Sequence, residues 1–216
     1  MNSATKDTKD TKDTKDTKDT KYIGTLGVNS CNSCNSWQFV ASGRNRMDLP
    51  FALNRLTANA EALAALARSV SEAQARWKPT PAAWSILEVL GHLYDEERED
   101  FRQRVDFTLH RPEADWPAID PQGWVTARGY NQRPLRAAVD AFIEERLNSL
   151  QWLKSLEDAN WASAKAHPAG GHVTAGDMLA AWVAHDHLHL RQLNELHWQY
   201  LATQAADFAL EYAGGW

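Results

Sequence analysis

Cysteine is nearly absent from this sequence: Cys31 and Cys34 are the only two among 216 residues. They form an isolated Cys-x-x-Cys pair in a polar segment, and no second pair follows that could complete a zinc ribbon. So few cysteines cannot build a disulfide framework, and proteins without one are typical of reducing compartments. We therefore expect a cytoplasmic protein that is held together by a hydrophobic core.

Long apolar runs are also missing. No stretch approaches the roughly 20 consecutive apolar residues that cross a bilayer, and the N-terminus lacks the apolar core of a signal peptide. The sequence contains neither a glycine-rich phosphate-binding loop nor a Gly-x-Ser-x-Gly elbow. We therefore predict no membrane partner and neither of these two kinds of site.

Positive charge is not in excess. The net charge is -5, from 23 basic and 28 acidic residues, and residues 1–46 hold 8 Lys or Arg against 5 Asp. The remaining residues carry 15 basic and 23 acidic side chains. This acidic part lacks the basic surface that nucleic-acid binding needs, so we expect a small-molecule substrate and no nucleic-acid partner.

The N-terminal segment is dominated by a repeat. Residues Thr5 to Lys21 are five Thr-Lys-Asp triplets followed by Thr-Lys, and they include no apolar residue. Because such a segment cannot offset the entropy lost on ordering, we predict that residues 1–46 form a disordered low-complexity tail. Met47 directly precedes the first apolar pattern. We therefore predict one domain over residues 47–216, and we hypothesise that translation begins at Met47.

Beyond the tail, apolar residues recur at steps of three and four, the spacing of an amphipathic helix. The predicted helices run from Leu49 to about Arg76, from Ile86 to about Leu109, from Pro134 to about Leu156 and from Thr174 to about Ala205. Residues 111–133 and 157–173 show no sustained period and are predicted to be loops, and no segment has a strand pattern. The fold class is therefore all-α, a four-helix bundle with long inter-helix connections.

Two histidines interrupt the apolar stripe of the last predicted helix. An α-helix turns about 100° per residue, so His185 and His189 share a face while His187 points away. Burying an imidazole without a partner is unfavourable, and two neighbouring ones need a shared reason to be there. A bound cation supplies that reason, so the pair indicates a metal site.

Two imidazoles are too few for a tight site, because zinc and similar ions take three or four donors. His92, in the middle of the second predicted helix, is the natural third ligand. Glu96 follows one turn later on the same face and is the candidate catalytic residue, either as a proton acceptor or as the group that orients His92. Asp95 and Glu97 are its alternatives.

Simpler interpretations exist for each of these residues. A core histidine is most often a hydrogen-bonded structural residue, and a helical glutamate such as Glu96 is most often a solvated surface carboxylate. The segment from His185 to His189 also resembles the zinc-protease helix His-Glu-x-x-His, with Asp186 in place of the general base. A bundle that binds metal for stability or sensing, without catalysis, is the alternative to an enzyme.

As a set, these residues resemble the DinB-like superfamily of damage-inducible proteins over about residues 49–200. The motifs that carry the resemblance are Gly91-His92-Leu93 with the acidic run after it, Tyr130-Asn131, His167-Pro168 with Gly171 and Thr174, and His185-Asp186-x-x-His189-x-x-Gln192-Leu193. The N-terminal tail and the loop of residues 111–133 are not explained by this family pattern.

The resemblance implies a DinB-like four-helix bundle in which His92, His185 and His189 hold a divalent metal ion. It also implies a metal-dependent enzyme. This enzyme is either a transferase that performs thiol S-transfer with a low-molecular-weight thiol as cosubstrate, or a hydrolase. Three imidazoles accept zinc, nickel, iron or manganese according to geometry and supply, and we expect zinc or nickel first. A homodimer is a further implication of the resemblance.

Overall fold

A computed structural model of the protein describes residues 48–168 and 170–216. The predicted disordered tail, the pair Cys31 and Cys34, and Met47 lie outside the described residues. In chain order the elements are α1 (Leu49–Arg68), α2 (Glu72–Arg76), α3 (Ile86–Asp95), the π-helix η2 (Glu96–Phe101), α4 (Arg102–His110), α5 (Pro121–Ala127), the 3-10 helix η3 (Tyr130–Gln132), α6 (Leu135–Lys154), strands β1 (Ala164–Ala166) and β2 (His172–Thr174), α7 (Ala175–Gln204) and the 3-10 helix η4 (Glu211–Ala213).

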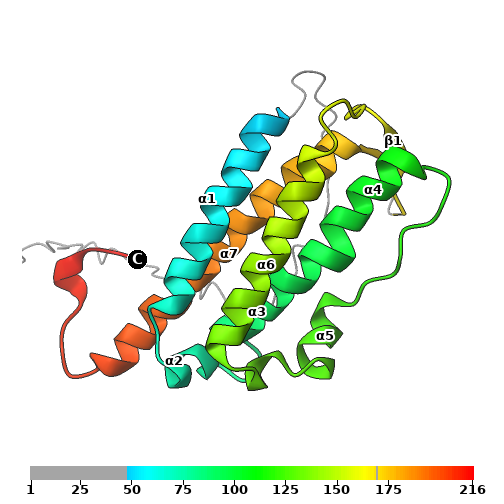
Figure 1. Cartoon of the computed structure of the whole chain (residues 1–216). Helices are drawn as coiled ribbons and strands as arrows, with labels where there is room; N and C mark the ends of the chain where they lie inside the picture. The colour runs from blue at the N-terminus through cyan, green and yellow to red at the C-terminus, as the bar shows by residue number, and fades with distance from the viewer. Residues whose placement is uncertain (1–47, 169) are drawn as a thin grey trace, which may run out of the picture.

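Four long helical segments form a bundle, as predicted (Figure 1). They are α1, the continuous rod made of α3, η2 and α4, then α6 and α7. Helix α1 packs against α6 and α7, and the rod packs against the same two helices. The colours of Figure 1 show that α1 and α7 run in one direction and the rod and α6 in the other. The rod and α6 are neighbours that run in the same direction, so the chain must return along the bundle between them. The connection between α4 and α6 provides this return.

The helix starts are set by side-chain caps. Ser85 and Glu88 form a capping box at α3, and Thr174 and Asp177 form another at α7. The prediction for the first helix was too long, because α1 ends at Arg68 and a separate short helix α2 follows. Ser71 begins that helix by accepting a hydrogen bond from the backbone of Gln74, so the chain turns within the predicted span.

The connections contain more regular structure than predicted. The segment between α4 and α6 includes α5, which Asp120 caps and Pro121 opens, and η3. The segment between α6 and α7 contains β1 and β2, which pair antiparallel with Lys165 opposite Val173. The prediction of no strands was therefore wrong for this hairpin, whose two strands of three residues each are too short to show a period of two.

The core is divided into two apolar clusters along the bundle. One contains Leu63, Leu90, Phe142 and Leu193, among others. The other contains Leu56, Phe101, Leu150, Leu179 and Trp182, among others. Where the two clusters meet, the rod, α6 and α7 carry buried polar side chains, among them His92, Asp95, Glu96, Glu97, Arg146, His185, Asp186 and His189. We call these eight residues the polar layer.

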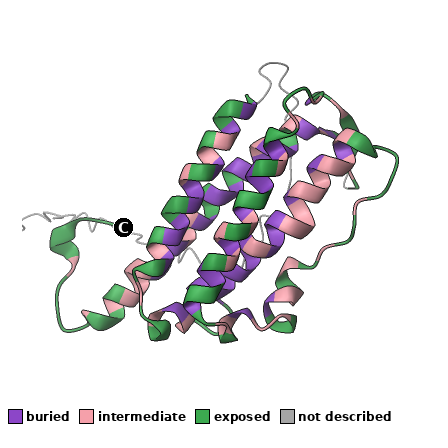
Figure 2. Ribbon diagram, viewed as in Figure 1, coloured by how far each residue is buried: buried purple, intermediate pink, exposed green. Residues whose placement is uncertain are grey.

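Figure 2 shows that the buried faces of the four helices turn toward one another while exposed residues cover the outside. Within the described ranges 48–168 and 170–216, no helix is long and apolar enough to cross a membrane.

Candidate metal centre

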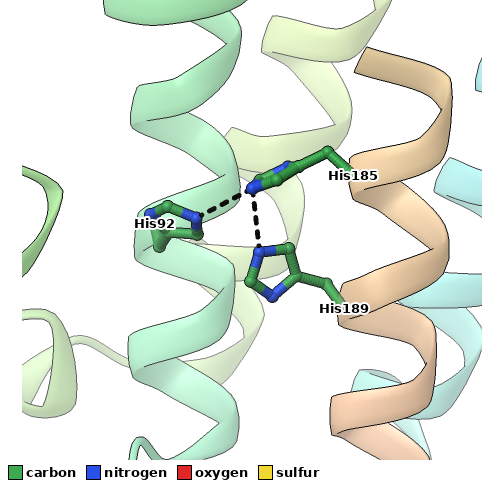
Figure 3. Close-up of side chains that lie close together, drawn as sticks. All are labelled: His92, His185 and His189. Carbon is green, nitrogen blue, oxygen red and sulfur yellow. Dashed lines mark hydrogen bonds between the residues drawn. The ribbon is translucent and has the colours of Figure 1, made fainter. Parts of the chain in front are cut away.

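Three histidine side chains meet within the polar layer (Figure 3). His92 comes from α3, and His185 and His189 come from consecutive turns of α7. His185 Nε2 lies 3.3 Å from His92 Nε2 and 3.1 Å from His189 Nε2, and one potential ligand atom from each residue lies within 4.8 Å of the others. All three residues are buried, and His185 is the most exposed of them at 8%.

The spacing of these nitrogens fits a shared metal ion. Two imidazole nitrogens that each lie about 2.1 Å from one ion are separated by about 3.0–3.4 Å when the bond angle is between about 90° and 109°. Both Nε2 separations that involve His185 fall in this range. One proton cannot bridge three nitrogens, whereas one cation can. The three imidazoles are therefore a suitable donor set for a divalent ion.

In His189 and His92, the ring nitrogen that faces away from the cluster has an oxygen neighbour. His189 Nδ1 lies 2.8 Å from Gln192 Oε1. Because an amide oxygen only accepts, this contact assigns the hydrogen to Nδ1 and leaves the Nε2 lone pair directed at the cluster. On α3, Glu96 Oε1 lies 3.6 Å from His92 Nδ1. An oxygen partner on the far nitrogen is the usual arrangement around a metal-binding histidine.

Aromatic rings pack against the cluster. The ring centroid of Trp84 lies 4.9 Å from that of His92, and the centroid of Phe101 lies 5.1 Å from that of His185. Both aromatic residues are themselves buried. Because such neighbours displace water, they lower the local dielectric and strengthen the electrostatic interactions of any ion held there.

Three consecutive acidic residues, Asp95, Glu96 and Glu97, are buried where α3 meets η2, and none is more than 2% exposed. A π-helix closes its hydrogen bonds from residue i to residue i+5, so consecutive side chains are about 80° apart instead of about 100°. Neighbouring acids can then face the interior together. The interpretation of Glu96 as a solvated surface carboxylate is therefore wrong, because its side chain lies against His92 inside the bundle.

Asp95 anchors the long connection to the rod. Its carboxylate accepts a hydrogen bond from the Tyr130 hydroxyl and lies 2.7 Å from Arg128 Nη1. Arg128 also forms a bidentate pair with Glu99. Burial and the Asp95 carboxylate raise the pKa of Tyr130 well above its ordinary value, so the hydroxyl stays a donor. Gly91 permits this contact, because a Cβ there would lie 2.3 Å from Tyr130 Cγ.

Glu97 and Asp186 bind one buried cation, the guanidinium of Arg146. Arg146 donates to both oxygens of Asp186 at 2.8 and 2.9 Å and to Glu97 Oε1 at 2.7 Å. It also donates to the backbone carbonyl of Leu56 at 2.8 Å, and Trp182 Nε1 donates to Glu97 Oε1 at 2.7 Å. Desolvation lowers the pKa of Arg146, but the charges of Glu97 and Asp186 outweigh it, and the net pKa is raised.

Sequence reasoning missed this network. The sequence does indicate that Arg146 is buried, because it lies four residues after Phe142 and four before Leu150 on the apolar face of α6. Asp186 was considered as a stand-in for the general base of a zinc protease. That interpretation does not fit, because both Asp186 oxygens are engaged by Arg146.

Comparisons with known proteins agree with this architecture. The sequence model of the DinB superfamily matches residues 55–193. YfiT from Bacillus subtilis, described as a probable metal-dependent hydrolase with an unusual four-helix bundle topology, has a similar structure, with a TM-score of 0.64, 17% identity, and coverage of 74% of this chain and 91% of YfiT. No curated protein matches in sequence.

A second solved structure is also similar. It is a histidine-to-alanine mutant of the mycothiol-dependent maleylpyruvate isomerase, with a TM-score of 0.53 and 12% identity. The match covers 68% of this chain and 61% of that enzyme. At these identities both likenesses show the fold.

Proposed function

The chain belongs to the DinB superfamily, and from this premise we propose that it is a metal-dependent enzyme whose divalent ion is held by His92, His185 and His189. The observation that carries the proposal is the convergence of three buried imidazoles from two helices, with Nε2 separations of 3.1 and 3.3 Å. Among the described residues, these three form the one cluster of histidine, cysteine or carboxylate side chains close enough to hold an ion.

The substrate of the proposed enzyme is a small electrophilic molecule. When bound, the ion supplies Lewis acidity, which brings the pKa of a water molecule or a thiol at an open coordination position toward neutrality. The three histidines leave such a position available, since they fill three of the four or more sites of zinc or nickel. The reaction is therefore thiol S-transfer, with a low-molecular-weight thiol as cosubstrate, or hydrolysis. Iron and manganese are the alternative ions.

We assign Glu96 a positioning role at this site. Its carboxylate lies beside His92 Nδ1, on the side of the ring away from the cluster. A carboxylate in that place orients the imidazole and increases its basicity toward a metal. Of the two roles considered for Glu96, this geometry supports orientation of His92 over direct proton transfer.

The burial of the three histidines favours one competing function, a bundle that uses the ion only for stability. His92 and His189 are each 1% exposed. A cation could therefore serve only to offset the unfavourable burial of the imidazoles, without activating a reactant. An enzyme differs from such a bundle in requiring a metal-dependent rate.

The experiment that separates the two functions combines metal analysis with a kinetic assay. We expect one divalent ion per chain, and addition of a thiol to a model electrophile, or hydrolysis of a model ester, that stops on chelation and returns on reloading. One tightly bound ion with no metal-dependent rate on either substrate would support the structural role. Protein that binds no divalent ion at all would refute both.

The remaining predictions about partners belong to the same proposal. We propose that the enzyme works in the cytoplasm without nucleic acid, as its two cysteines and the acidic domain indicate. Homodimer formation remains a prediction from the family, and sedimentation of the metal-loaded protein would test it.

A further inference from the structure

We propose that the buried network of Glu97, Arg146 and Asp186 is a positioning device for the metal centre. It fixes the rotation of α7 about its own axis, so that His185 and His189 face His92. This inference rests on the proposed function, because it concerns the residues that hold the ligands in place. Glu97, Arg146 and Asp186 are not among the proposed metal ligands.

The contacts of Arg146 connect all four bundle helices at one level. The guanidinium extends from α6 to Asp186 on α7, to Glu97 on the rod and to the Leu56 carbonyl on α1. Its side chain is 1% exposed, so these contacts are shielded from competing water. A guanidinium is planar and its donor groups are parallel, so a carboxylate can pair with it only from a narrow range of directions. An ammonium group imposes no such restriction.

The pairing between Arg146 and Asp186 fixes the residue next to His185, a proposed metal ligand. Asp186 follows His185 directly, so the two side chains leave α7 about 100° apart. Both Asp186 oxygens are held by Arg146, at 2.8 and 2.9 Å. With Asp186 fixed toward α6, the His185 ring is directed to the neighbouring face, where α3 lies. His189, one turn later, is within about 40° of His185 and is set by the same rotation.

Energetics support positioning over stabilisation. A buried ion pair gains Coulomb energy but loses the hydration of both ions, and well-packed apolar replacements are often neutral or stabilising. The network also contains two carboxylates for one guanidinium, a formal excess of one negative charge in the bundle interior. That charge is unfavourable for an empty bundle and favourable beside a divalent cation. The first point argues against a mainly stabilising role for the network, and the second indicates that its net charge favours a cation bound nearby.

The test replaces the whole network, so that no partner is left as an isolated buried charge. In the triple variant Glu97→Gln, Arg146→Met, Asp186→Leu, the amide introduced at position 97 keeps an acceptor for Trp182 Nε1. We expect cooperative thermal unfolding to persist while the Kd for Co²⁺ rises about 10- to 100-fold, the range for loss of outer partners of metal ligands. The visible absorption of bound Co²⁺, which reports coordination geometry, should change as well. An unchanged Kd and spectrum would overturn the proposal.

The control is a buried cationic side chain elsewhere in the fold. Lys165 on β1 donates to the carbonyls of Pro112 and Ala114 at 2.8 and 2.5 Å, and neither contact involves the polar layer. Lys165→Met should lower the melting temperature and leave the Kd for Co²⁺ unchanged. A rise in Kd equal to that of the triple variant would show that general loss of stability explains the effect, and would also overturn the proposal.

A single substitution decides the question if the triple variant does not fold. Arg146→Lys retains the charge but cannot present two parallel donors to Asp186. The inference requires weaker Co²⁺ binding in this variant, and wild-type affinity would refute it. Wild-type protein that binds no divalent ion would instead refute the proposed function, so the two failures are distinguishable.

Discussion

The two apolar clusters and the polar layer where they meet are built from the same helices but obey different physical rules. The clusters are filled by aliphatic and aromatic side chains such as Leu63 and Leu90, which are fully buried and need no specific polar partner. The polar layer holds histidines and charged residues, each with a specific partner at a specific distance. Burial of apolar area stabilises the clusters, whereas burial of charge in the layer requires compensation.

This difference separates two properties that are often assigned to a core as a whole. The clusters should carry most of the free energy of unfolding, and the polar layer should carry the ion affinity. Substitutions of cluster residues that do not pack against the histidines are then expected to leave the ion affinity nearly unchanged, because sites without shared partners contribute almost additively.

The largest effect on stability is expected from the apolar side. Leu63→Ala removes a fully buried side chain on α1 and should lower the free energy of unfolding by about 3–5 kcal/mol, since it loses apolar burial and leaves a cavity. Urea denaturation of the metal-free protein would measure this change. The stoichiometry of bound metal in the folded variant should remain that of the wild type, and a loss of metal would break the separation of the two regions.

The matching substitution in the polar layer is His189→Ala. Removing one of three ligands should raise the Kd for the divalent ion at least about 100-fold, because each ligand of a structural zinc site contributes about 3 kcal/mol. Helical content by circular dichroism should be retained, since the apolar clusters are untouched. His187→Ala is the matched control, because His187 lies on the same helix but is exposed. Unchanged metal stoichiometry in His189→Ala would contradict the ligand assignment.

A smaller effect is expected from the residue that holds His189 in place. Gln192 accepts the hydrogen of His189 Nδ1, so Gln192→Ala should weaken metal binding by about 10- to 100-fold without removing a ligand. Calorimetric titration of both proteins with Zn²⁺ would measure the difference. Gln192→Glu keeps an acceptor at this position and should restore much of the affinity. Equal affinities for all three proteins would place Gln192 outside the site.

The smallest effect concerns the edge of the polar layer. A hydrogen bond from Arg128 lowers the pKa of Glu99 below its ordinary value of 4.5. The folded protein therefore favours the ionised form, and this contribution is present above pH 4.5 and is lost as the pH falls through the lower folded pKa. Glu99→Gln should reduce stability at pH 7 by about 0.5–1 kcal/mol, as is typical of a partly exposed pair. The difference from the wild type should shrink as denaturation is repeated below pH 4.5.

Much of the apolar framework could be predicted from the sequence, because the spacing of apolar residues records helical faces directly. The helices that contain His92, His185 and His189 begin close to their predicted positions, and the capping box of Ser85 and Glu88 lies at the start of α3. The prediction for the first helix was too long because the apolar spacing continues past Arg68 to Val70, although Ser71 already caps α2.

The polar layer was only partly predictable. His185 and His189 were found because two imidazoles on an apolar stripe depart from the pattern around them. Arg146 was not, since periodicity identifies a buried position but not the partner of a charge placed there. Nor could spacing reveal η2, because the assumption of about 100° per residue is the one that a π-helix breaks.

The π-helix also has a consequence for how the length of this chain can vary. A single π-turn accommodates one residue more than an α-turn over the same rise, so the residues on either side keep their faces. Loss of the codon for Arg98, Glu99 or Asp100 should therefore yield an uninterrupted α-helix in which Leu90 and Val105 still face the core. Such a shortened protein would fold, but the adjacent carboxylates of Glu96 and Glu97 would no longer both be accommodated inside.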